Sequence, residues 1–256
     1  MLLALVMVVL SALGPVAVAT SPTRQDLSAQ FQGPSAQHLL GTDQYGRDVL
    51  ARVVAGARRS LLVSLTVVGS TLLVGVVVGV IAATGGRLVD ALVARFIDIL
   101  LALPGFVVAV AVLGLLGRGL SQLVIAFLIA GWAPYARMAR GLALGAGQRP
   151  DVLVARAAGV RRRRILLTHV APHILRQLLV VGTVDLGYVI VGLAAFSYLG
   201  FGVQPPTPEW GSMLREGQDF FSTAPWLLIA PGAGIALTVI AVNLIGEHVH
   251  VQGVAR

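Results

Sequence analysis

The chain has 256 residues, of which 57% are hydrophobic and only 12% charged, and it carries a formal net charge of +8. Soluble domains carry about 25% charged residues, so we expect a membrane protein, whose positive charge reflects arginines that hold loops in the cytoplasm rather than nucleic-acid binding. The absence of lysine and cysteine excludes a P-loop lysine, a lysine Schiff base and thiolate chemistry.

Six segments are apolar and long enough, or nearly so, to cross a bilayer, for which a helix needs about 20 residues. They are residues 2–19, 61–83, 91–117, 120–135, 173–199 and 226–245. The sequence therefore predicts an all-α fold, a polytopic bundle of about six transmembrane helices. We expect residues 1–60 to form an N-terminal transmembrane helix and an external loop, and residues 61–256 to form the main membrane domain with a cytoplasmic insert at 141–172.

The first apolar segment has three interpretations. It is long enough for a span, but Ala17-Val18-Ala19 also resembles a signal-peptidase site. A signal peptide requires a basic residue before its apolar run, and no basic residue precedes this one. A start further upstream, with a short cytoplasmic tail, is the third interpretation.

The distribution of arginine predicts the orientation, because cytoplasmic loops are rich in basic residues. The loop between the fourth and fifth spans contains Arg137, Arg140, Arg149, Arg156, Arg161, Arg162, Arg163 and Arg164. If this loop is cytoplasmic, both termini are cytoplasmic and the external loops are 20–60, 117–120 and 200–225. The last is acidic, as expected outside, whereas 20–60 is an exception with five arginines against three aspartates.

The insert has the pattern of a helix, a glycine break and a second helix. Asp151 follows Pro150 at a position where a negative charge favours a helix start, and residues 152–158 are mostly helix formers. Gly159 is expected to end this piece. Residues 161–167 begin a second piece, and Pro172 marks its end or a kink near the membrane.

This insert resembles the EAA loop of the permease subunits of binding-protein-dependent ABC importers. Leu153-Val154-Ala155 stands where that family has Glu-Ala-Ala, Gly159 is its glycine and Pro172 its proline. His169 matches a histidine that the peptide-transport branch often has before the proline. The departures are Leu153 for the glutamate and Val154 for an alanine.

Two further stretches resemble the second permease subunit of the dipeptide, oligopeptide and nickel branch of that family. Residues 41–50, Gly-Thr-Asp-Gln-Tyr-Gly-Arg-Asp-Val-Leu, match its G-T-D-x-x-G-R-D segment. Residues 197–211 match its S-x-L-G-x-G-x-x-P-P-x-P-x-W-G segment. With the insert, the resemblance covers the chain from about residue 38 to its end.

The resemblance implies a permease subunit in the bacterial plasma membrane that forms half of a translocation pathway for peptides. Its expected partners are a second permease subunit, two ABC ATPases, an extracytoplasmic solute-binding protein and the lipid bilayer, with no nucleic acid. The chain has no G-x-x-x-x-G-K-[ST] motif, so we expect no cofactor on it and ATP on the partner ATPases.

The same resemblance implies an ATPase-coupling loop, in which Arg156 and Arg161–Arg164 are the expected contacts. The expected loop residues are Asp151, Leu153, Ala155, Arg156, Gly159, Arg161, Arg162, Arg163, Arg164, His169 and Pro172. The alternative is that these arginines only retain the loop in the cytoplasm or meet anionic lipid.

A stiff, polar external stretch suits docking of the solute-binding protein, because each proline fixes its own φ and restricts the preceding residue. The candidates are Gln204, Pro205, Pro206, Glu209 and Trp210, and the alternative role is a structural cap. For Asp43, Arg47 and Asp48 we expect local salt bridges that fold the first external loop.

Ionisable residues inside spans are costly unless paired or hydrated. Asp98 lies one turn from Arg95, which favours a local pair. Asp185 has no partner nearby in sequence, so it is a candidate for the pathway, where it meets a substrate amine, or for a contact with the partner permease. His169 and His173 have metal-ligand spacing, but a pair at the membrane surface is the simpler interpretation.

Other functions differ in cargo or in class. The motifs fit a nickel or other small-solute importer equally well, and a secondary carrier independent of ATP is a remote alternative. We expect no catalytic or metal site: a membrane enzyme needs a constellation such as HExxH or GxSxG, and the sequence contains neither.

Overall fold

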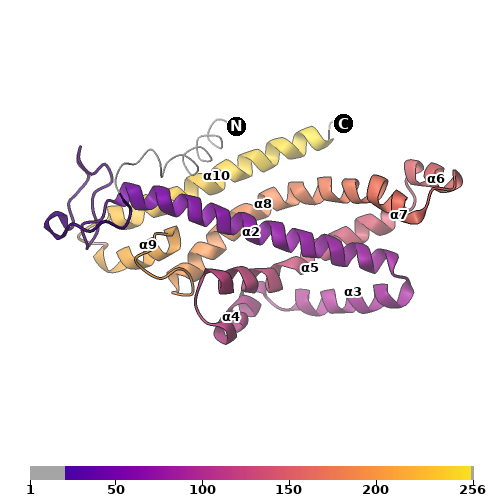
Figure 1. Ribbon diagram of the computed structural model, residues 1–256, viewed down its shortest axis with the longest axis horizontal. Helices are drawn as coiled ribbons and strands as arrows, with labels where there is room; N and C mark the ends of the chain where they lie inside the picture. Colours follow the sequence, from indigo (N-terminus) through magenta and orange to yellow (C-terminus); the bar gives the residue numbers. More distant parts are fainter. Residues whose placement is uncertain (1–20, 255–256) are drawn as a thin grey trace. The chain divides into compact units, whose positions relative to one another are not determined.

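The computed structural model describes the backbone of residues 21–254 and the side chains as far as Glu247. Over this range the chain is helical, with loops and one isolated β-bridge between Thr42 and Asp48. The elements are η1 (Leu27–Ala29), α2 (Val49–Thr84), α3 (Arg87–Ala102), α4 (Gly105–Leu116), α5 (Leu120–Ala146), α6 (Pro150–Ala157), α7 (Arg162–Ile165), η2 (Leu166–Val170), α8 (Ala171–Tyr198), α9 (Trp210–Gly217), η3 (Gln218–Phe220) and α10 (Trp226–Val254) (Figure 1).

The all-α membrane fold is confirmed. In the part of the chain that the structure describes, four helical stretches are long and apolar enough to span a membrane: Val49–Thr84, Leu120–Ala146, Arg162–Tyr198 and Trp226–Glu247. The pair α3 and α4 passes the same test together but is bent by 89°. These five correspond to the second to sixth predicted spans, and the predicted span at 2–19 lies outside the described residues.

The start of α2 differs from the prediction. The helix begins at Val49 rather than at residue 61, so Arg52, Arg58 and Arg59 belong to a helix instead of an external loop. Hydropathy places the start of a span where the apolar residues begin. Because these arginines interrupt the apolar pattern, the first three turns of α2 were assigned to the loop. Asp48 sits just before the helix and accepts a hydrogen bond from the Ala51 N–H at 2.8 Å, which stabilises its first turn.

The chain divides into two compact units. In the described range, the first unit holds the residues up to Thr66, the segment Leu116–Val124 and the residues from Thr183 on. The second holds Val67–Leu115 and Ile125–Gly182.

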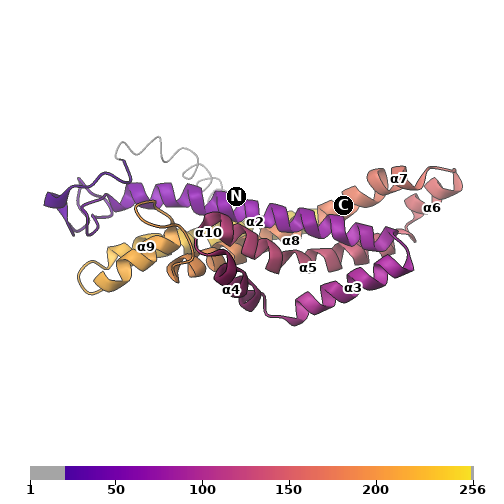
Figure 2. The ribbon, with the colours of Figure 1, turned by 60° about the horizontal axis from the view of Figure 1, so that its bottom comes forward.

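In the second unit, α2 and α5 approach closely at two glycines. A Cβ on Gly75 would lie 2.4 Å from the Cβ of Tyr135, and one on Gly79 would lie 2.4 Å from the carbonyl oxygen of Ala136. The spacing Gly75-x-x-x-Gly79 is the small-residue pattern that lets membrane helices pack closely. α3 also lies alongside α5, with Ile97 packed against Ala133 and Ala136 (Figures 1 and 2).

In the first unit, residues 21–52 and 200–227 fold together into a compact region that we call the cap. Val49, Ala224 and Leu227 form its buried apolar cluster, against which Phe31 and Phe220 pack with ring centroids 4.9 Å apart. The indole N–H of Trp226 donates to the carbonyl oxygen of Thr42 at 3.1 Å, which ties the first loop to the start of α10.

Candidate functional site

Within the predicted insert, 141–172, residues 150–165 form a folded knob, whereas α5 continues to Ala146 and the residues after 165 continue into α8. Pro150 occupies the first turn of α6, where its missing N–H costs nothing. Arg149 donates from Nε and Nη2 to the two carboxylate oxygens of Asp151, both at 3.1 Å. Burial opposes the charged form of Asp151, but the hydrogen bond and positive charge of Arg149 prevail and hold its pKa below the usual range.

Gly159 ends α6 in the way the sequence predicts. Its φ is +73°, a left-handed conformation that favours glycine. The Val160 N–H donates to the Ala155 carbonyl and the Gly159 N–H donates to the Arg156 carbonyl, both at 3.0 Å. These two bonds form a Schellman motif, which gives the chain a fixed turn between α6 and α7.

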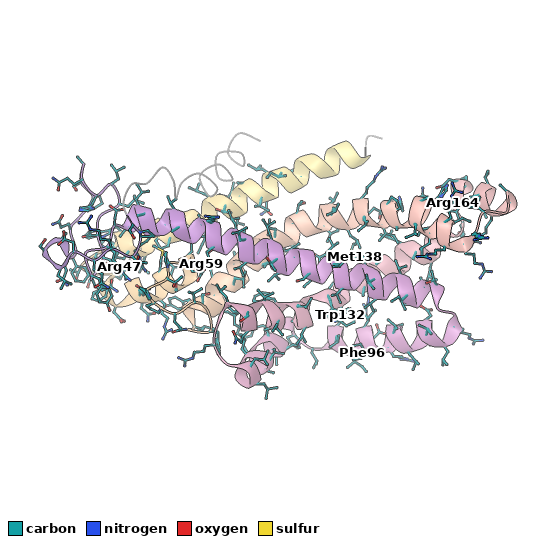
Figure 3. All side chains as sticks on the ribbon, in the orientation of Figure 1. Arg47, Arg59, Phe96, Trp132, Met138 and Arg164 are labelled. Atoms are coloured by element: carbon teal, nitrogen blue, oxygen red, sulfur yellow. The ribbon has the colours of Figure 1, made fainter. Side chains whose placement is uncertain are left out.

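The knob is held against the rest of the second unit by apolar side chains. Val152 on α6 and Ile165 on α7 are buried in one cluster with Ala146, Val170 and Ile174. Besides Asp151, which pairs with Arg149, the large side chains of the knob that remain exposed are apolar or basic. They are Leu153, Val154, Arg156, Arg161, Arg162, Arg163 and Arg164. Arg164 marks this surface in Figure 3.

The prediction that the second piece ends or kinks at Pro172 is wrong in one respect. α7, η2 and α8 form one continuous helical stretch, Arg162–Tyr198, so Pro172 does not end it. The π-helical turn η2 ends at Val170, two residues before the proline. A proline removes one backbone bond and crowds the carbonyl four residues earlier, and a wider turn accommodates both effects.

The two histidines each contact a neighbour in sequence rather than one another. His169 Nδ1 lies 2.6 Å from the Thr168 hydroxyl, and His173 Nε2 lies 3.0 Å from Gln177 Nε2. Among the residues described, no group of three or more metal-binding side chains comes together.

The external docking candidates divide into exposed and buried residues. Gln204, Pro205 and Pro206 are exposed and stay available for docking. Glu209 and Trp210 are buried, so the prediction that they contact a docking protein is wrong. Glu209 instead caps α9, accepting from the N–H groups of Gly211 and Ser212 at 3.0 Å each and from the Ser60 hydroxyl at 3.1 Å.

Trp210 joins α9 to α2. Its side chain is only 1% exposed and packs with Ala57 and Met213, and its indole N–H donates to the carbonyl oxygen of Val53 at 3.0 Å. Glu209 and Trp210, which follow the proline-rich stretch, therefore both stabilise the fold around the cap. The tryptophan in this motif is explained by packing.

A buried ion network in the cap was missed by the sequence analysis. Arg47 pairs with Asp43 as predicted, at 2.5 Å, but its Nη2 also donates to Glu216 at 2.5 Å. Arg52 donates to the two oxygens of Glu216 at 3.2 and 3.1 Å. The signal was available, because the excess of arginines in 20–60 is matched by the excess of acids in 200–225.

The first loop contains further contacts. Asp48 pairs with His38 at 2.9 Å rather than with an arginine. Arg59 donates to the Pro208 carbonyl at 2.7 Å, so an arginine of α2 also holds the proline-rich stretch. Arg47 and Arg59 are labelled in Figure 3.

Two interhelical ion pairs join α3 and α5. Arg140 donates to both oxygens of Asp90, at 2.5 and 2.7 Å. Arg137 donates to Asp98 at 2.5 Å, so the expected local pair of Asp98 with Arg95 is wrong. A partner on the neighbouring helix replaces the one a turn away because α3 and α5 pack side by side.

Asp185 lies within α8 and is partly buried. No hydrogen bond or ion pair joins it to another side chain among residues 21–247. A carboxylate inside a span is costly unless it is paired or hydrated, so the partner of Asp185 is water or a group outside this described range.

Comparisons with known proteins place these features in one family. A family model described as "Binding-protein-dependent transport system inner membrane component" matches residues 75–251. The dipeptide transport system permease protein DppC of Alkalihalophilus pseudofirmus is 36% identical over 94% of this chain and 79% of its own length. The di/tripeptide transport system permease protein DppC of Pseudomonas aeruginosa is 40% identical over 85% of this chain and 72% of its own length.

A relative with another printed cargo and two solved structures are also similar. The nickel transport system permease protein NikC of Escherichia coli K12 is 36% identical over 88% of this chain and 82% of its own length. A chain from the inward-facing MetNI methionine ABC transporter gives a TM-score of 0.62 at 16% identity, covering 80% of this chain and 97% of that one. A chain from an amino acid ABC transporter with histidines gives a TM-score of 0.59 at 14% identity, covering 77% of this chain and 91% of that one. At these identities the structures support the fold alone.

Proposed function

Because this chain belongs to the family of binding-protein-dependent transport system inner membrane components, we propose that it is one permease subunit of an ATP-driven importer of di- or oligopeptides. It forms half of the translocation pathway and catalyses no reaction itself. The peptide cargo rests on the two relatives whose names specify dipeptides or di- and tripeptides.

The observation that carries this proposal is the knob. A short helix fixed by a Schellman turn and by buried Val152 and Ile165 moves as one body with the helices beneath it. Its exposed surface combines apolar Leu153 and Val154 with five arginines. Such a surface fits a groove on a separate ATPase subunit that is apolar inside and acidic at its rim.

The knob explains how ATP enters the cycle without binding to this chain. ATP binds to two partner ATPases, whose closure moves the knob, and the knob moves the membrane helices between two states. A second permease subunit completes the pathway, and Asp185 faces either that pathway or that subunit.

The orientation follows from the same assignment. The knob lies in the cytoplasm, both termini of the chain are cytoplasmic, and the cap lies outside. There the exposed residues Gln204, Pro205 and Pro206 meet the solute-binding protein. The basic surface of the knob is also consistent with the rule that arginines stay on the cytoplasmic side.

Nickel is the second candidate cargo, because NikC matches this chain at 36% identity over 88% of its length. The two cargoes differ in the binding protein that supplies them. Uptake of labelled dipeptide and of nickel by the same reconstituted importer separates them: uptake of nickel alone would reject the peptide assignment.

Co-purification with the partner ATPases tests the role of the knob. Replacing Arg162, Arg163 and Arg164 by glutamine removes three exposed charges from the knob, and replacing Arg24, Arg58 and Arg118 removes three exposed charges elsewhere. We expect the first variant to lose ATPase binding and the second to keep it. Equal binding by both variants would contradict the coupling assignment.

A further inference from the structure

The contact between α3 and α5 has two chemically different flanks. Ile97 lies at its centre, packed against Ala133 and Ala136. Because a helix turns by about 100° per residue, the residues before and after Ile97 point to opposite sides of this contact. Phe96 stacks on Trp132 with ring centroids 6.0 Å apart, and Asp98 binds Arg137 at 2.5 Å.

The flank that carries Asp98 is open. The side chains of Asp98 and Arg137 are 57% and 55% exposed, although both helices belong to membrane-spanning segments. The neighbouring pair Asp90–Arg140 is only 26% and 28% exposed and is held by two hydrogen bonds. Charged groups within a span face water or protein rather than lipid, so the open flank is not a lipid-facing surface.

A break in the same span provides a second, independent observation. α3 ends at Ala102 and α4 begins at Gly105, with an 89° bend between them, and Leu103 and Pro104 are exposed. Non-helical backbone at membrane depth occurs only where protein buries it or where it lines a water-filled cavity. Broken helices of this kind commonly form substrate sites in transporters.

We propose that Asp98 and Arg137 line the water-filled translocation pathway and bind the charged ends of the cargo peptide, Asp98 the ammonium group and Arg137 the carboxylate. This inference rests on the proposed function, since it requires a zwitterionic cargo. Phe96 and Trp132, which are labelled in Figure 3, form the opposite, aromatic flank of the same contact.

The chemistry of the pair suits this exchange. A solvent-exposed ion pair contributes little to stability, so it opens at small cost when a peptide supplies both charges. The guanidinium of Arg137 offers parallel N–H donors that match a carboxylate. The Asp98 carboxylate accepts from an ammonium group, and each of the two charges of the pair keeps an opposite charge beside it before and after the exchange.

Cysteine labelling of the assembled importer in membrane vesicles tests whether the flank is wet, because the chain has no cysteine of its own. Gly141→Cys lies one turn beyond Arg137 on α5, with nothing within 4 Å of the added Cβ. Phe96→Cys on the aromatic flank is the matched control. Neither variant removes a charge of the pair.

We expect a charged, membrane-impermeant thiol reagent to modify Gly141→Cys, dipeptide to slow that reaction, and Phe96→Cys to react only with a lipophilic maleimide. Failure of the charged reagent at Gly141→Cys would overturn the proposal, whether lipid or the partner permease covers the position. Reaction at Gly141→Cys with no effect of dipeptide would overturn the binding role.

Uptake kinetics test whether Asp98 binds the amino end of the peptide. Loss of one hydrogen bond to a charged group changes affinity about tenfold, so we expect Asp98→Asn to raise the KM for a free dipeptide about tenfold. N-acetylation of the peptide should raise the KM of the unmodified importer but add nothing in Asp98→Asn. Asp90→Asn is the control and should leave the KM unchanged.

Additive effects of N-acetylation and Asp98→Asn would contradict direct contact. The two proposals fail separately: an importer that carries no peptide rejects the proposed function, whereas an importer that carries peptide with unchanged KM in Asp98→Asn rejects only this site.

Discussion

Arg47 in the first loop and Glu216 in α9 lie 169 residues apart in sequence, yet Nη2 of the arginine donates to the carboxylate at 2.5 Å. Arg52 binds the same carboxylate, and both arginines are almost fully buried, with 1% and 2% of their side chains exposed. Asp43 supplies the second negative charge, 2.5 Å from Arg47. The cap therefore contains a neutral cluster of four charges that joins its two segments.

Neutralising Glu216 should destabilise the cap strongly. In Glu216→Gln two buried guanidinium groups share only Asp43, and removing one partner of a buried ion pair costs about 3–5 kcal/mol. Asp219→Asn removes one negative charge from an exposed position of the same segment and should change stability by less than about 0.5 kcal/mol. Thermal unfolding of the purified subunit measures both. Equal melting temperatures for the two variants would refute the role of the cluster.

Exposed and buried residues of the proline-rich stretch should respond to substitution in opposite ways. Trp210→Ala removes a fully buried side chain and should cost about 3–5 kcal/mol of stability. Gln204→Ala removes an exposed side chain, so it should leave stability unchanged. If the solute-binding protein docks here, the substitution should weaken its binding to the importer. Melting temperature and a binding titration distinguish them. A stable Trp210→Ala variant with weakened docking would reverse our assignment.

Local features of this fold could be read from the sequence. The spans follow from apolar runs, and α6 with its end at Gly159 follows from helix propensity and from the freedom of glycine. Each of these features depends on residues that are close together in the sequence. The wrong start of α2 has the same origin, because arginines in its first turns lower the local hydropathy to that of a loop. The carboxylate that pairs with Arg52, Glu216, is distant in sequence.

Contacts between distant segments could not be read in this way. Asp98 has Arg95 one turn away, but helix packing brings Arg137 closer. In the sequence, Glu209 and Trp210 have the pattern of surface residues in a polar stretch. Only the folded structure shows that they pack against α2. For Arg47 and Arg52, the charge balance between two loops was the one available clue.

The close contact of α2 with α5 predicts a difference between two glycines of one helix. A methyl group on Gly79 would lie 2.4 Å from the Ala136 carbonyl and 2.8 Å from Ala139, whereas one on Gly69 meets nothing within 4 Å. Gly79→Ala should therefore destabilise the subunit by about 1–3 kcal/mol through overpacking. Gly69→Ala should be neutral or stabilise it by up to about 1 kcal/mol. Thermal unfolding in one detergent compares the pair, and equal destabilisation would contradict this packing.

The turn at Gly159 gives a prediction about coupling. A β-branched residue is disfavoured at φ +73°, at a cost of about 1–2 kcal/mol, whereas asparagine tolerates this conformation. No neighbouring atom lies within 4 Å of an added Cβ, so the effect is one of backbone conformation and not of collision. We expect Gly159→Val to insert normally but to misplace α6 relative to α7.

In an importer with its ATPases, Gly159→Val should hydrolyse ATP without matching uptake of peptide, and Gly159→Asn should transport normally. The ratio of peptide imported to ATP hydrolysed measures this directly. Because both substitutions add a side chain at one open position, their difference isolates the left-handed turn. A normal ratio in Gly159→Val would mean that α6 and α7 act independently, and the knob would then not transmit motion as one body.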